Sequence, residues 1–168
     1  MSDIKIVIHD LSVEELGQID FPPEKYLLIS AEEKAVCCQG CFGCWLKLPG
    51  KCVYKDRLQY IGAVMAQSEE ITVISRNCYG GYSYGIKQIF DRSIGGNLPF
   101  FTYRGGKLHH LNRYKDKPSF TVYMYGAMSA FERKIASELV QANSMNMGYQ
   151  NTRIFFAENS LQLKGALR

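Results

Sequence analysis

Five short runs rich in β-branched residues alternate with segments of helical periodicity, and this alternation limits the fold more than any other feature of the chain. The runs span residues 4–8, 26–30, 71–75, 119–125 and 153–157. The third, Ile71-Thr72-Val73-Ile74-Ser75, is almost continuously apolar, which is typical of a parallel strand buried on both faces. Strands that alternate with helices predict an α/β fold, a doubly wound five-stranded parallel sheet with helices on both faces.

The segments between these runs carry the signals of helices. Apolar residues recur at helical spacing over residues 55–67 and 86–94, and a third helix is expected from residue 129 to about residues 143–147. The Ser-x-x-Glu pattern of a capping box, which marks the start of a helix, occurs twice. The two boxes are Ser12 with Glu15 and Ser129 with Glu132.

Length and composition indicate one folded domain over residues 1–168. The chain has 168 residues, and a domain usually takes ~100–200. Apolar residues make up 46% and charged residues 21% of the chain, which is typical of a globular protein. The apolar stretches are far shorter than the ~18–20 residues of a membrane span, and residues 1–5 lack the features of a secretory signal. We therefore expect a cytoplasmic protein with no membrane partner.

The cysteines are crowded, since five of the six fall within residues 37–52. Disulfides rarely persist in a reducing cytosol, so clustered thiols there are more often metal-binding or catalytic. Four of the thiols form the pattern C-x2-C-x2-C-x7-C, namely Cys38, Cys41, Cys44 and Cys52. Such a set can ligate an iron–sulfur cluster or, with less typical spacing, a tetrahedral zinc ion. The alternative is that the cysteines are small buried hydrophobic residues.

Residues 95–118 show little periodicity, so we expect a long loop there. The segment is basic, with Arg104, Lys107, His109, His110, Arg113, Lys115 and Lys117. A basic lid could attract the phosphates of NADPH, while the alternatives are a mobile solvated loop or a subunit contact through residues 98–101. The pI of 8.7 is below the value of about 9 expected of a dedicated nucleic-acid binder, and no recognition motif is present. We expect no nucleic-acid partner.

A doubly wound sheet binds its ligand beyond the carboxyl ends of its strands. That rule selects the loops at residues 9–12, 75–84 and 125–129, of which the second is rich in Gly and Tyr. Glycines would let the backbone approach a planar ligand, and two tyrosines could stack on it; the alternative is a surface turn. The candidate ligand contacts are Ser75, Asn77, Cys78, Tyr79, Gly80, Gly81, Tyr82, Ser83, Tyr125 and Gly126.

Three stretches together carry a resemblance to a known family. They are Cys38-Gln39-Gly40-Cys41-Phe42-Gly43-Cys44-Trp45, then Pro49-Gly50-Lys51-Cys52, and downstream Lys87-Gln88-Ile89-Phe90-Asp91-Arg92. The chain resembles the flavodoxin-like NADPH-dependent FMN reductase superfamily and, more narrowly, its iron–sulfur flavoprotein branch. The resemblance implies a flavodoxin-like sheet of order 2-1-3-4-5, FMN at the candidate contacts, NADPH as co-substrate and a homo-oligomer. It also implies a four-iron four-sulfur cluster on the four cysteines named above.

The loop after the first strand departs from that family, whose members hold the FMN phosphate there in a Ser/Thr-rich loop. Here the loop is only His9-Asp10-Leu11-Ser12, in which Asp10 would repel a phosphate and Ser12 alone offers a hydroxyl. Three hypotheses follow. The first is an FMN-dependent oxidoreductase that passes electrons from NAD(P)H to a flavin, quinone or other small-molecule acceptor, with no catalytic side chain. The others are an iron–sulfur flavoprotein electron carrier and a non-catalytic flavodoxin-fold module that has lost FMN binding.

Overall fold

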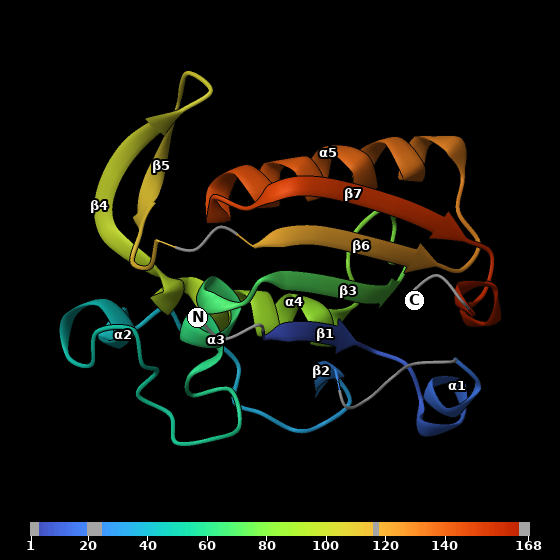
Figure 1. Ribbon diagram of the computed structural model, residues 1–168, viewed down its shortest axis with the longest axis horizontal. Helices are drawn as coiled ribbons and strands as arrows, with labels where there is room; N and C mark the ends of the chain where they lie inside the picture. The colour runs from blue at the N-terminus through green and yellow to red at the C-terminus, as the bar shows by residue number, and fades with distance from the viewer. Residues whose placement is uncertain (1–3, 20–24, 116–117, 165–168) are drawn as a thin grey trace.

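The computed structural model describes residues 4–19, 25–115 and 118–164, and it is built on one parallel sheet (Figure 1). The sheet order is β2-β1-β3-β6-β7, and every neighbouring pair is parallel. Without β4 and β5, which lie outside this sheet, the order is the expected 2-1-3-4-5. The strands are β1 Lys5–His9, β2 Tyr26–Ser30, β3 Glu70–Arg76, β6 Ser119–Tyr125 and β7 Gln150–Ala157.

The helices follow the expected order, and their bounds show one clear error of sequence interpretation. They are α1 Val13–Gln18, α2 Gly43–Leu46, α3 Ile61–Gln67, α4 Tyr84–Arg92, α5 Ala130–Met147 and the 3₁₀ turns η2 Ser93–Gly96 and η3 Ser160–Leu163. Both capping boxes are present. The helix expected over residues 55–67 begins only at Ile61, because Asp56 accepts the backbone N–H groups of Val36 and Leu58 and holds the preceding residues in turns. Within the described ranges, no helix is both long and apolar enough to cross a membrane.

Side chains of alternate strand residues pack into two separate hydrophobic cores, one on each face of the sheet. Ile6 and Ile8 pack with α3, α4 and α5 on one face, while Val7 packs with Leu11 and Leu163 on the other. Helices on both faces are thus confirmed, but the cover is unequal. Within the part of the chain that the structure describes, the helical cover of the second face is the six-residue α1 and the four-residue η3.

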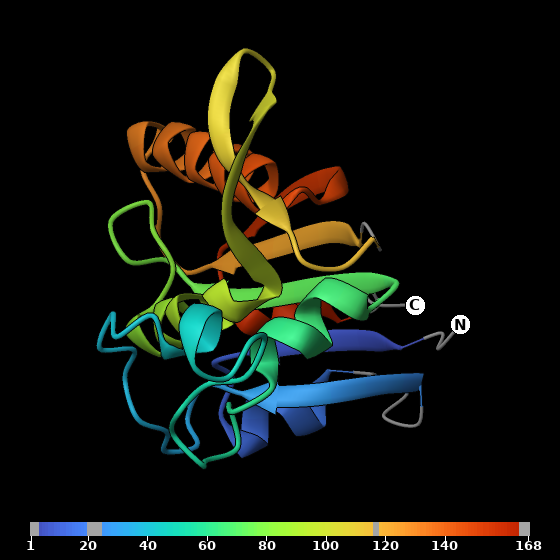
Figure 2. The ribbon, with the colours of Figure 1, turned by 90° about the vertical axis from the view of Figure 1, so that its left-hand side faces the viewer.

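The prediction of a long loop over residues 95–118 is wrong. Most of this segment forms an antiparallel hairpin of β4 Asn97–Arg104 and β5 Lys107–Asn112. The strands are joined by Gly105 and Gly106, whose φ angles of 55° and 76° match a type I′ turn. A Gly-Gly pair between two strand-like runs is a hairpin signal that the periodicity argument passed over. The hairpin projects from the end of the sheet where the strands begin (Figures 1 and 2).

Candidate functional site

The carboxyl ends of β1, β2 and β3 enclose a crevice of about 530 Å³, at the sheet edge that the topology selects. β1 leads into Asp10, β2 leads into Ala31 and Glu32, and β3 ends at Arg76. The start of α4 forms the remaining side of the crevice. The lining residues are Asp10, Ser12, Glu15, Ala31, Glu32, Arg76, Ser83, Tyr84 and Gly85. The volume lies within the range of ~300–1,000 Å³ that is usual for small-molecule sites.

The carboxylate of Asp10 is engaged by neighbouring protein groups. It accepts the backbone N–H of Arg76 at 2.9 Å and the hydroxyl of Tyr125 at 3.0 Å. The contact with β3 fixes the loop after β1 against the neighbouring strand. Burial and the nearby Asp10 carboxylate raise the pKa of Tyr125 above its ordinary range, so this hydroxyl stays protonated and available as a donor.

The first turn of α1 is closed by its own side chains. Ser12 donates its backbone N–H to Glu15 Oε2 at 2.9 Å, and Glu15 donates its backbone N–H to Ser12 Oγ at 3.2 Å. Ser160 Oγ donates to the other oxygen of Glu15 at 2.7 Å. The hydrogen bonds from Ser12 and Ser160 lower the pKa of Glu15, so its carboxylate is ionised at neutral pH.

Among the described residues that line the crevice, Arg76 is the one cation, and it shares the crevice with Asp10, Glu15 and Glu32. Its guanidinium lies over the ring of Tyr125, 5.8 Å from the centroid. The hydrogen bond with Tyr125, followed by the charges of Asp10 and Glu15, raises the pKa of Arg76. The charge of the crevice is therefore negative on balance.

The glycine-rich loop after β3 forms a tight turn. Cys78 and Gly81 exchange backbone hydrogen bonds of 3.0 and 2.8 Å, and the φ angles of Tyr79 and Gly80 are 54° and 83°. A Cβ on Gly80 would lie 2.9 Å from the carbonyl oxygen of Glu132. The glycine at this position thus allows the turn to pack against α5.

Asn77 and Ser75 hold the ends of this loop. Asn77 Oδ1 accepts the N–H of Gly80 at 2.8 Å, and its Nδ2 donates to the carbonyl of Ala127 at 3.0 Å. Ser75 Oγ, fully buried, accepts the N–H of Ser83 at 2.9 Å. These contacts position the loop by hydrogen bonds within the protein.

The two tyrosines that could stack on a ligand differ in exposure. Tyr79 is 86% exposed, whereas Tyr82 is 7% exposed and lies 5.1 Å from the ring of Phe90 in the core. Burial raises the pKa of Tyr82 to about 12. The ring of Tyr79 is therefore open to solvent, while Tyr82 packs inside the protein.

The predicted contacts are divided between two cavities and the protein interior. Of the ten, all within the described ranges, Ser83 lines the crevice, while Gly81 and Tyr82 line a second cavity of about 730 Å³ between α4, the hairpin and α5. Tyr125 is buried beneath Arg76, and Gly126, at φ 109°, donates its N–H to Ala157. Sequence reasoning missed Glu15, Glu32, Arg76, Tyr84 and Gly85 as crevice residues. The rule that ligands bind at the carboxyl ends of strands did select the loop that contains Arg76 and Tyr84. The predicted contacts in that loop, however, were chosen for its glycines.

The four patterned cysteines line one small cavity of about 20 Å³, roughly the space of one water molecule. Burial and the neighbouring thiols raise the pKa of Cys44. Among the described residues, no group of three or more His, Cys, Asp or Glu side chains is arranged to hold a metal ion. The thiols thus share a cavity without forming a coordination site. Cys37 and Cys78 do not belong to its lining.

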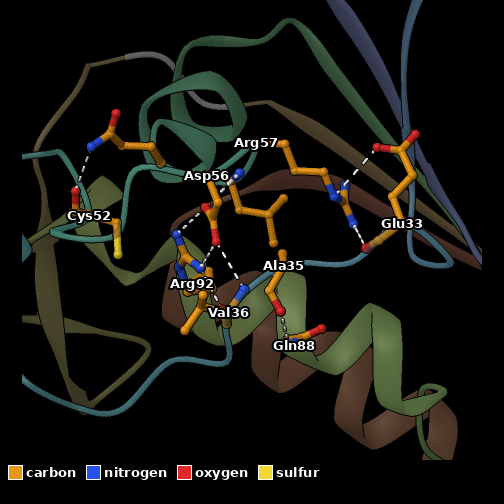
Figure 3. Close-up of polar contacts among 10 residues, drawn as sticks. Glu33, Ala35, Val36, Cys52, Asp56, Arg57, Gln88 and Arg92 are labelled. Carbon is orange, nitrogen blue, oxygen red and sulfur yellow. Dashed lines mark hydrogen bonds and ion pairs between the residues drawn. The ribbon is translucent and has the colours of Figure 1, made fainter.

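Residues 35–58, here called the cysteine segment, are anchored to α4 by polar contacts (Figure 3). Arg92 donates to both carboxylate oxygens of Asp56 at 2.8 and 2.7 Å, and to the carbonyl of Val36 at 2.5 Å. Gln88 donates to the carbonyl of Ala35 at 3.2 Å. The cysteine cavity includes Arg92 at the end of α4, whereas the crevice includes Tyr84 at its start. A helix of nine residues separates the two sites by roughly 13 Å.

Two arginines of the hairpin region have structural partners. Arg104 donates to the carbonyls of Met145 and Asn146 at the end of α5, at 2.9 and 3.1 Å. Arg113 donates to the carbonyl of Gly95 at 3.0 Å. The fold itself uses these two guanidinium groups, and the interpretation of the segment as a basic lid stays a prediction. Lys117 lies outside the described residues.

Comparisons with known proteins rest on structure alone, because neither a protein-family model nor a curated protein matches the chain. An FMN-dependent NADH-azoreductase from Bacillus anthracis str. Ames Ancestor, in complex with FMN, superimposes with a TM-score of 0.59 at 11% identity, over 95% of this chain and 89% of that one. Smu.1420 from Streptococcus mutans UA159 gives 0.61 at 8% identity, over 92% and 87%. The fold is flavodoxin-like. An azoreductase from Bacillus anthracis str. Sterne has the same fold, with a TM-score of 0.56 at 12% identity over 96% and 89% of the two chains.

Proposed function

We propose that this chain is a flavodoxin-fold oxidoreductase that holds a flavin in the crevice and passes electrons from a reduced nicotinamide to a small acceptor such as a quinone or an azo compound. The observation that carries the proposal is the crevice itself, which lies at the carboxyl ends of β1, β2 and β3 in a fold shared with an FMN-bound azoreductase. A ligand site at this edge is what the topology of a doubly wound sheet favours.

The residues of the crevice would bind and orient the flavin. Tyr84, 74% exposed, and Gly85 form the wall at the start of α4, and Ala31 lies opposite. A Cβ on Gly85 would lie 2.8 Å from the carbonyl oxygen of Ala31, so this glycine keeps the two walls close together. A bound flavin supplies the redox chemistry, and the protein supplies position and electrostatics. No side chain is needed as an acid or base.

The phosphate of FMN does not fit the β1–α1 loop as this chain builds it. The backbone N–H of Ser12 in this loop is held by Glu15, the neighbouring N–H of Arg76 is held by Asp10, and the crevice lining is acidic. The proposal therefore concerns the uncharged part of the flavin, and no step is assigned to the phosphate.

The proposal is tested by titrating the purified protein with FMN and with riboflavin while flavin fluorescence is recorded. We expect quenching that saturates in the micromolar range with at least one of the two. Tyr84→Ala should weaken binding several-fold. Tyr103→Ala, on the hairpin and equally exposed at 76%, is the matched control and should bind as the parent does. Absence of binding by both flavins at high micromolar concentration would exclude the proposed flavin function.

A second candidate function, an iron–sulfur electron carrier, is favoured by the single cavity that Cys38, Cys41, Cys44 and Cys52 line. Four thiols suit an iron–sulfur cluster by ligand type. The cavity is smaller than any cluster, so residues 38–52 must move apart for one to be held. We expect protein prepared without oxygen to contain iron and to absorb broadly in the visible. Cys44→Ser should abolish both signals and Cys37→Ser neither; iron-free, colourless protein would exclude this candidate.

A further inference from the structure

We propose that the crevice selects a flavin without a phosphate, so that riboflavin binds more tightly than FMN. This inference rests on the proposed function and specifies its ligand. It starts from the conflict between the fold, which is shared with an FMN-bound azoreductase, and the acidic character of the crevice in this chain.

The first argument is charge. Asp10, Glu15 and Glu32 contribute three carboxylates to the crevice, and Arg76 contributes one cation. That cation is already close to Tyr125, Asp10 and Glu15. A phosphate monoester carries about −1.5 to −2 charges at neutral pH, because its second pKa is about 6. Bringing it into this crevice sets like charges against one another, whereas riboflavin is uncharged and meets no such repulsion.

The second argument concerns donors. A phosphate accepts hydrogen bonds and is usually held by free backbone N–H groups at the start of a helix. Here the backbone N–H of Arg76 is held by Asp10, that of Ser12 by Glu15, and that of Glu15 by Ser12 Oγ. α1 has only six residues, so it offers little helix dipole to an anion. Two of these three donors are thus held by the chain's own carboxylates and the third by a hydroxyl, so none of the three is free for an anionic ligand.

The third argument is the complement of the second. The crevice presents carboxylate oxygens, which accept hydrogen bonds, and the ribityl chain of riboflavin ends in a hydroxyl, which donates one. FMN replaces that hydroxyl with a phosphate ester, which only accepts. Glu32 is exposed at the end of β2, with an oxygen free to take such a bond among the described residues. The terminal hydroxyl of riboflavin can therefore donate a hydrogen bond to the crevice carboxylates, whereas the phosphate of FMN is repelled by them.

The test compares dissociation constants for riboflavin and FMN at low ionic strength. We expect riboflavin to bind at least ~10-fold more tightly, and the ratio to shrink at 0.5 M salt, because salt screens charge repulsion. In the double variant Glu15→Gln with Glu32→Gln, FMN binding should improve about 10-fold while riboflavin binding changes little. Glutamine at position 15 keeps the capping box, so the fold of α1 is preserved.

Glu14→Gln is the matched control. Glu14 lies in the first turn of α1 but does not line the crevice, so its loss removes one charge without changing the wall. It should leave the ratio of the two constants as in the parent. A thermal melt of each variant verifies folding, and Glu32→Gln alone, at an exposed position, remains interpretable if the double variant is unstable.

The outcomes are separate. Equal or tighter binding of FMN would overturn this inference and leave the proposed flavin function standing. A riboflavin preference that persists unchanged in the glutamine variants would overturn the role assigned to the carboxylates. Failure of both flavins to bind would remove the proposed function and the inference with it.

Discussion

At the scale of single residues, the ion pair between Arg92 and Asp56 is a two-pronged contact that lies outside the crevice. The side chain of Arg92 is fully buried and that of Asp56 is 19% exposed. Asp56 also accepts the N–H groups of Val36 and Leu58. One carboxylate therefore joins α4 to both ends of the cysteine segment (Figure 3).

We expect Asp56→Asn to lower the free energy of unfolding by about 3–5 kcal/mol, because it leaves the buried guanidinium of Arg92 without its counter-charge. The measurement is urea denaturation at pH 7. Asp91→Asn is the matched control. Its ion pair with Lys87 lies on the exposed face of the same helix, with side chains 46% and 60% exposed, and its loss should cost no more than about 0.5 kcal/mol. Equal losses of unfolding free energy in the two variants would contradict the stabilising role given to the Arg92–Asp56 ion pair.

The same ion pair predicts a pH dependence. The hydrogen bonds from Arg92 lower the pKa of Asp56 from 3.8 to about 2. A lowered pKa in the folded state means that the stabilisation is fully present above about pH 4 and is lost as the pH falls towards 2. The difference in unfolding free energy between the parent and Asp56→Asn should therefore narrow over this window. A constant difference from pH 7 to pH 2 would show that the carboxylate does not titrate as described.

At the scale of elements, the hairpin contacts both α5 and α2. Arg104 binds the last carbonyls of α5, where a positive charge also suits the helix dipole. On β5, the ring of His110 lies 4.8 Å from Trp45 of α2 and 4.5 Å from Phe101. A two-stranded hairpin is only marginally stable by itself, so these contacts decide its position.

Arg104→Ala should release the hairpin from α5. We expect the amides of residues 97–112 to exchange with deuterium at least ~10-fold faster, since hydrogen bonds from a charged group contribute about 1.5–3 kcal/mol. Lys107→Ala, at an exposed position of the same hairpin, should leave exchange unchanged. Unchanged exchange in both variants would mean that the contact of Arg104 with α5 does not hold the hairpin.

At the scale of the whole molecule, apolar surface is left exposed on the hairpin. Phe100 is 64%, Phe101 59% and Tyr103 76% exposed. Exposed aromatic groups of this kind often mark contacts with another protein chain. We expect a homo-oligomer in which residues 98–101 contribute to the subunit contact.

Sedimentation at micromolar concentration should show a species larger than the monomer. Phe100→Ser should shift the equilibrium towards monomer, whereas Phe131→Ser, 70% exposed at the start of α5, should not. A parent protein that sediments only as monomer would contradict the expected oligomer. The same result for both variants would place the contact elsewhere.

The strand order followed from the resemblance to flavodoxin-like reductases, whereas the sequence alone determined the parallel sheet and both capping boxes. These depend on local signals: β-branched runs, helical spacing, and a Ser with a Glu three residues later. The acidic character of the loop at residues 9–12 was also readable, because Asp10 has no Lys or Arg beside it within the loop. The Gly-Gly turn of the hairpin was readable too, but went unused.

Only the tertiary structure decided which of these residues meet. Asp10 binds the backbone of a residue 66 positions away, and Glu15 binds a serine 145 positions away. Tyr79 and Tyr82 lie three residues apart, yet one is exposed and the other is core. Burial and charge pairing depend on contacts between distant segments, which no local pattern records. For that reason the sequence located the edge of the sheet where a ligand should bind, and the structure determined which side chains line it and with what charge.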